Sequence, residues 1–84
     1  MKHTDYTFTI EARDVPGTLV RITQVFARRG CNIKSLVVRS KQHDGWSVID
    51  IDAYDIEKPV QIEKQLQKLI DIHTVSTSQK EINA

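Results

Sequence analysis

The six residues Asp14-Val15-Pro16-Gly17-Thr18-Leu19 have the types and the order needed to hold a free amino acid. Pro16 favours a turn or the first positions of a helix, because its φ is fixed and it has no N–H. Gly17 lets a ligand approach the backbone closely. The N–H groups from Thr18 onward would have no acceptor inside the helix, and with the helix dipole they favour a carboxylate. Asp14, at the edge of the turn, could receive an ammonium group. The alternative is that these residues only cap a helix.

The length and composition of the chain restrict the classes of protein to which it can belong. A chain of 84 residues supports one small domain. Its 12 basic and 11 acidic residues give a net charge of +1, so no strong field favours nucleic acid or a membrane surface. The single cysteine, Cys31, excludes an internal disulfide framework and fits a reducing compartment. Neither a membrane-spanning run of about 20 apolar residues nor a signal-peptide core is found. We therefore expect a soluble, cytoplasmic domain.

Four segments have the alternation or composition of β-strands: residues 6–12, 31–39, 46–54 and 72–78. In the third segment, one face carries Ser47, Ile49, Ile51 and Ala53, and the other carries Trp46, Val48, Asp50, Asp52 and Tyr54. Two aspartates would be costly inside a core, so we expect their face to meet solvent. The polar stretch 40–45 predicts the loop of a hairpin between the second and third strands.

Two further segments have helical spacing. The first runs from Leu19 to Arg29, and its core-facing residues are predicted to be Leu19, Ile22 and Phe26, with Gly30 ending the helix. Pro59 opens the second helix, whose apolar side is predicted to carry Ile62, Leu66, Leu69 and Ile70. Residues 80–84 are expected to form a disordered tail after a domain that spans residues 5–79.

The order of these elements is βαββαβ, which predicts an α+β fold of the ferredoxin-like type. This fold is a four-stranded antiparallel sheet with two helices on one face. Right-handed crossovers place the first and third strands at the centre of the sheet and the second and fourth strands at its edges. Many functions use this fold, so the fold alone does not decide between them.

Two functional classes find little support in the residues. The segment Asp44–Val48 loosely resembles the aromatic motif of RNA-recognition domains, but Glu11, Asp50 and Asp52 share the open sheet face and would repel a phosphodiester. The three histidines are scattered over the terminus, a loop and the last strand, and no metal-binding or phosphate-loop motif occurs. We therefore expect no catalysis, no cofactor, no metal and no nucleic-acid partner.

Three segments resemble the ACT domain, and more narrowly the small, regulatory subunit of acetolactate synthase: Gly17–Arg21, Arg29–Leu36 and Gln61–Asp71. The resemblance runs from about Phe8 to Val75. The last segment carries the narrower likeness, since the glycine turn is common to ACT domains generally. The resemblance implies an ACT fold, a regulatory rather than catalytic role, and a homodimer joined side by side through the second strand.

The resemblance also implies a branched-chain amino acid held between two subunits and a catalytic subunit of acetolactate synthase as partner. One chain would contribute Asp14, Gly17, Thr18 and Leu19 to the ligand site, and the other would contribute Asn32 and Ile33. The chain departs from the family pattern in two ways. Asp14 stands where these subunits typically carry Asn, and the second domain of the longer members has no counterpart. Two alternatives therefore stay open: a free-standing ACT-domain amino-acid sensor, and a structural activating subunit with no ligand.

Overall fold

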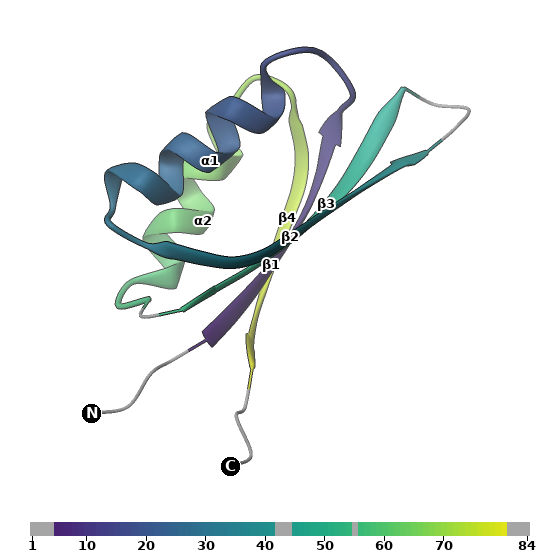
Figure 1. The fold of residues 1–84 in the computed structure, drawn as a ribbon. Helices are drawn as coiled ribbons and strands as arrows, with labels where there is room; N and C mark the ends of the chain where they lie inside the picture. Colours follow the sequence, from purple (N-terminus) through teal and green to yellow (C-terminus); the bar gives the residue numbers. More distant parts are fainter. Residues whose placement is uncertain (1–4, 42–44, 55, 81–84) are drawn as a thin grey trace.

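A computed structural model describes residues 5–41, 45–54 and 56–80 of the chain. Its elements are β1 (Asp5–Arg13), α1 (Thr18–Arg28), β2 (Asn32–Lys41), β3 (Trp46–Tyr54), α2 (Pro59–Gln67) and β4 (Ile72–Lys80). Both helices lie on the same side of the sheet (Figure 1). The predicted ferredoxin-like βαββαβ arrangement is confirmed.

The four strands form one antiparallel sheet in the order β2-β3-β1-β4. The prediction that the first and third strands occupy the centre is therefore confirmed, and β2 and β4 are the edges. β1 pairs with β3 from Tyr6 opposite Ala53 to Arg13 opposite Trp46. Because this pairing places the end of β1 beside the start of β3, the loop that follows β1 lies close to the β2–β3 hairpin.

The hydrophobic core lies between the helices and the inner face of the sheet. The rings of Phe8 in β1 and Phe26 in α1 meet edge to face, with their centroids 5.1 Å apart and their planes at 79°. The other buried apolar residues are Ile10, Ala12, Ile22, Val25, Ile49, Ile51, Ala53, Ile56, Ile62 and Leu66. Alternation thus predicted the buried faces of both central strands correctly.

The predicted inward orientations of Leu19 and Ile70 are wrong. Leu19 is 39% exposed, because the stripe of α1 that packs on the sheet runs through Thr18, Ile22 and Phe26 and leaves Leu19 beside it. Ile70 is 94% exposed, because α2 ends at Gln67 and the chain then turns toward β4. The amides that follow Gln67 bond to carbonyls only three residues back, which tightens the end of the helix.

Both edge strands differ slightly from their predicted bounds. β2 begins at Asn32 instead of Cys31 and extends to Lys41, into the stretch expected to be a loop. Residues 42–44 of that loop lie outside the described residues. β4 extends to Lys80, which was expected to belong to the tail, and residues 81–84 also lie outside the described residues.

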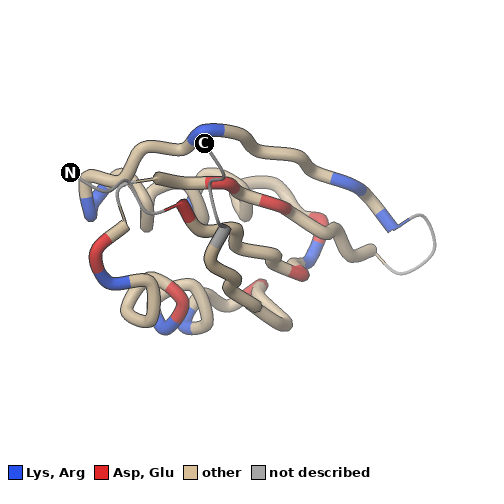
Figure 2. Tube along the Cα trace, turned by 90° about the horizontal axis from the view of Figure 1, so that it is seen from below, with Lys and Arg blue, Asp and Glu red and all other residues tan. Residues whose placement is uncertain are grey.

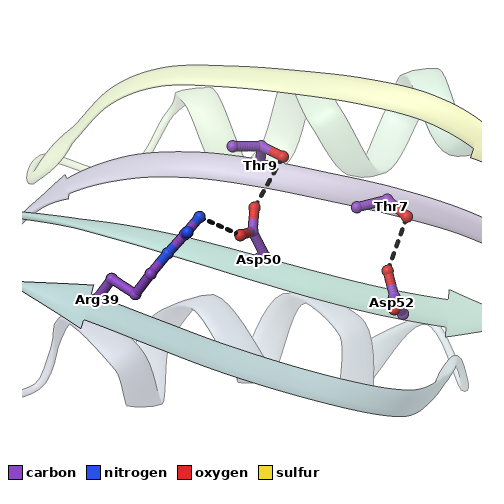
Figure 3. A network of polar contacts seen from close by, with 5 residues as sticks. All are labelled: Thr7, Thr9, Arg39, Asp50 and Asp52. Carbon is purple, nitrogen blue, oxygen red and sulfur yellow. Dashed lines mark hydrogen bonds and ion pairs between the residues drawn. The ribbon is translucent and has the colours of Figure 1, made fainter.

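The sheet face away from the helices carries a row of polar contacts (Figure 3). Asp50 accepts hydrogen bonds from Thr9 Oγ1 at 2.9 Å and from Arg39 Nη2 at 2.7 Å. Asp52 accepts a hydrogen bond from Thr7 Oγ1 at 2.7 Å. The predicted polar face is confirmed, but its two aspartates are half-buried and paired with β1 threonines instead of being fully solvated.

Candidate functional site

A tight turn at Val15–Thr18 connects β1 to α1. The Thr18 N–H donates to the carbonyl oxygen of Val15 at 3.3 Å, and Gly17 has φ 88° and ψ −16°. These are the hydrogen bond and the third-residue dihedral angles of a type II turn, which favours Pro at its second position and Gly at its third. Pro16 and Gly17 occupy those positions, and Gly17 is also the N-cap of α1.

The turn determines which backbone amides remain for a ligand. Thr18 was expected to offer its N–H, but the turn uses that group. The Arg21 N–H makes the first helical bond, to the Gly17 carbonyl oxygen at 3.1 Å. The amides of Leu19 and Val20 lie between these two and have no acceptor within the helix. Any anion site at this end of α1 therefore depends on those two amides and the helix dipole.

The side chains of Thr18 and Leu19 point in different directions. Thr18 is only 5% exposed, and its Oγ1 has no hydrogen-bond partner among the described residues. It lies in the sheet-facing stripe with Ile22, beneath the helix. Leu19 is accessible at the surface instead. A ligand outside the turn would therefore meet the Leu19 side chain and not the Thr18 hydroxyl.

Asp14 connects the same loop to the β2–β3 hairpin. Its Oδ2 accepts a hydrogen bond from Ser40 Oγ at 3.1 Å, and its N–H donates to the carbonyl oxygen of Gly45 at 2.7 Å. Asp14 is exposed, so its carboxylate stays available to a cation from solvent. The contact with Ser40 places the acidic edge of the turn beside the last residues of β2.

Arg21 is a candidate residue that was not singled out from the sequence. Its guanidinium atoms lie 3.7–3.9 Å from the position that a Cβ on Gly17 would occupy. Its Nη1 also forms an ion pair with Asp71 Oδ2 at 3.3 Å, and its side chain is 54% exposed. A positive group beside the turn would strengthen attraction for a carboxylate. The sequence could have indicated Arg21, because it follows Gly17 by four residues, about one helical turn, and so lies on the same side of the helix.

Asn32 and Ile33 lie at the start of β2, at the opposite end of α1 from the turn. The 11 residues of α1 span about 16 Å. Asn32 is exposed and Ile33 is half-buried. One chain therefore brings Asp14, Gly17 and Leu19 together but leaves Asn32 and Ile33 apart from them.

Among the described residues, Glu11 and Cys31 have altered pKa values, and both lie outside the turn. On the open face, a hydrogen bond from Lys41 lowers the pKa of Glu11 below its usual value. Burial raises the pKa of the Cys31 thiol. Within residues 5–41, 45–54 and 56–80, no three His, Cys, Asp or Glu side chains gather where they could hold a metal ion. No helix in those ranges is long and apolar enough to cross a membrane.

Comparison with known proteins places this geometry in a family. The model of the AHAS small subunit-like ACT domain matches residues 8–74. The chain is 41% identical over 71 residues to the acetolactate synthase small subunit 1, chloroplastic, of Nicotiana plumbaginifolia, covering 83% of this chain and 16% of that protein. It is 40% identical over 77 residues to the probable acetolactate synthase small subunit of Archaeoglobus fulgidus, covering 90% of this chain and 46% of that protein.

A solved structure agrees with the sequence match. The crystal structure of the acetolactate synthase small subunit from Thermotoga maritima superposes with a TM-score of 0.75 and 31% identity, covering 87% of this chain and 46% of that chain. The present chain thus spans less than half the length of each of these relatives. From the glycine turn, the βαββαβ topology and the match over residues 8–74, it follows that the chain belongs to the family of AHAS small subunit-like ACT domains.

Proposed function

We propose that this chain is the amino-acid-sensing module of an acetolactate synthase small subunit, and that it binds a branched-chain amino acid between two copies of itself. The observation that carries the proposal is the contact between Asp14 and Ser40. It places the turn, with its carboxylate and its free amides, at the end of an edge strand. A second chain paired with that strand would complete the site.

The exposed edge of β2 supports the dimer. Val37 and Val38 lie in the middle of this strand and are 51% and 45% exposed. Proteins usually cover an edge of this kind, because unpaired backbone groups and apolar side chains promote association. Antiparallel pairing of β2 with its symmetry copy about the strand centre would make one continuous sheet. That pairing brings Asn32 of the partner subunit opposite the Ser40–Lys41 end of β2.

The outer flank of α1 supports the same arrangement. Arg21 and Arg29 bond to Asp71 and to α2 residues, so their flank of α1 faces α2. Leu19, Thr23 and Ala27 recur every four residues along a different flank, away from those contacts. The small side chains at the last two positions would allow a second α1 helix to approach closely when two sheets join through β2.

The ligand fits this seam by its chemistry. Its carboxylate would bind the amides of Leu19 and Val20 beside the Arg21 guanidinium. Its ammonium group would pair with Asp14. Its branched aliphatic side chain would lie between Leu19 and Ile33 of the partner subunit, since both are apolar and at least partly accessible.

A ligand that bridges two subunits can act as a regulator. It favours the dimer geometry that it fits best, and it shifts activity only by its difference in affinity for the two states, typically about 1–3 kcal/mol. The chain itself would do no chemistry. It would bind the catalytic subunit and change its turnover.

The test mixes the purified chain with the catalytic subunit of acetolactate synthase from the same source. We expect complex formation, altered turnover, and a further change when valine, leucine or isoleucine is added. The variant Asn32→Ala should still form the complex but lose the response to amino acid. If the wild-type chain never alters the catalytic subunit, the regulatory role is wrong, and amino-acid binding by the isolated chain would then favour a free-standing sensor.

A further inference from the structure

A groove of about 570 Å³ lies between the two helices, away from the glycine turn. Its walls come from the last turns of both helices and combine a basic rim with an apolar part. The lining residues are Val25, Arg28, Arg29, Gln65, Lys68 and Leu69. Three of the six are cationic. The volume lies within the range of about 300–1,000 Å³ that is typical of small-molecule sites.

Neutral groups fix the orientation of Arg29 in this groove. Its Nε donates to Gln65 Oε1 at 3.2 Å, and its Nη1 donates to Gln61 Oε1 at 3.0 Å. These amide oxygens hold the guanidinium in place without neutralising its charge. Arg21, on the same helix, differs because it is paired with a carboxylate. The guanidinium of Arg29 is thus preorganised for an anion.

The other two cations also lack a carboxylate partner. Across the described ranges, no Asp or Glu forms an ion pair with Arg28, Arg29 or Lys68. Acidic positions (red in Figure 2) occur on the sheet strands and also along the helical segments. Asp50 and Asp52 belong to the central strand β3. Among the described residues, the three cations of the groove are therefore not neutralised by direct ion pairs.

A neighbouring hollow of about 370 Å³ shares Arg29 with the groove. Its other lining residues are Gly30, Cys31, Glu57 and Lys58, so this second hollow includes an acid. Basic residues are common at helix ends, where they interact favourably with the dipole. In the larger groove, however, they come from the ends of two different helices and converge on one hollow.

We propose that the groove between α1 and α2 binds a small phosphate monoester. The phosphate would contact Arg28, Arg29 and Lys68, whose N–H groups suit its oxygens. The organic part would pack on Val25 and Leu69. The groove lies apart from the proposed amino-acid site, so the two sites can be tested separately.

The test is a calorimetric titration of the full chain with phenyl phosphate at constant ionic strength. We expect saturable binding of one molecule per chain. Arg28→Ala and Lys68→Ala should each weaken binding about tenfold, the effect of losing one charge-assisted contact. The control is Arg39→Ala, which removes the same charge from the open sheet face, and it should change affinity less than about twofold.

Three results would overturn the proposal. They are the absence of saturable binding at millimolar phenyl phosphate, an equal loss of affinity in Arg39→Ala, and binding of an acidic peptide at these residues without binding of phenyl phosphate. Circular dichroism checks the fold, and Arg28→Gln and Lys68→Gln replace any alanine variant that loses helical signal. Valine binding measured on the same variants separates the two sites, because it should be unchanged if both proposals hold.

Discussion

Replacement of Gly17 by alanine tests the turn at the centre of the proposed site. Gly17 has φ 88°, a conformation that L-residues rarely adopt. Space is not the obstacle, because the nearest atoms to an added Cβ would be those of the Arg21 guanidinium at 3.7–3.9 Å, an ordinary contact distance. The cost therefore comes from the backbone. A left-handed conformation costs an alanine about 1–2 kcal/mol.

The free energy of unfolding of Gly17→Ala should fall by this amount, which lowers the melting temperature of a domain of this size by about 4–16 °C. Gly30→Ala is the matched control. Gly30 has φ 68° and nothing within 4 Å of an added Cβ, and it lies at the other end of α1. Both variants should lose similar stability in urea unfolding monitored by circular dichroism.

Binding of valine should distinguish the two variants. Relaxation of the turn in Gly17→Ala would move the amides of Leu19 and Val20, so calorimetry should show a clear loss of affinity. Gly30→Ala should lose apparent affinity for valine only to the extent that part of the protein is unfolded, because its turn at Gly17 is intact. Equal affinities in folded samples of the two variants would refute the role of the turn, and an undiminished stability of Gly17→Ala would refute the backbone argument.

Three further predictions concern the seam and the altered pKa values of Glu11 and Cys31. Val38→Lys should make the protein monomeric in sedimentation experiments, because it places a charge in the seam between β2 strands. The control Val60→Lys on α2, at a position 59% exposed in the wild type, should leave the protein dimeric. A dimeric Val38→Lys would contradict the proposed seam. Because the pKa of Glu11 is lowered, the contribution of its carboxylate to stability is present at neutral pH and is lost as pH falls below the usual pKa of 4.5. Lys41→Met should raise the pKa of Glu11 in an NMR titration, because it removes the hydrogen bond that lowers this pKa. An unchanged pKa would contradict the assignment to Lys41. Because burial raises the pKa of Cys31, iodoacetamide should alkylate this thiol more slowly at neutral pH in the folded protein than in urea, and equal rates would count against it.

Most of the fold could be predicted from local patterns in the sequence. Alternation along residues 46–54 identified the buried side of β3, and the composition of the Pro16–Gly17 pair located the turn. The rotation of α1 was harder to predict, because Thr18 and Leu19 both fit the helical spacing of Ile22 and Phe26. Packing on the sheet buries Thr18 and leaves Leu19 exposed, although the apolar character of Leu19 suggested the core.

Contacts between distant residues explain why the site was only partly predictable. Asp14 and Ser40 are 26 positions apart, and Arg21 and Asp71 are 50 apart. Neither pair follows from spacing, since each joins a loop residue to a residue in a helix or strand that is distant in the sequence. The tight end of α2 has a similar origin, because the chain must turn there to enter β4, and this leaves Ile70 exposed despite its helical spacing.

The most direct test of the central claim is a mixing experiment with two damaged subunits. In the proposed dimer, Asp14 and Asn32 of each site come from different chains. Asp14→Ala and Asn32→Ala should each bind valine poorly in calorimetry, but a mixed dimer would contain one site with both native residues. Mixing the two variants should therefore restore binding at close to wild-type affinity. If both variants are folded and exchange subunits, and the mixture still binds no better than either alone, the amino acid is not held between two chains.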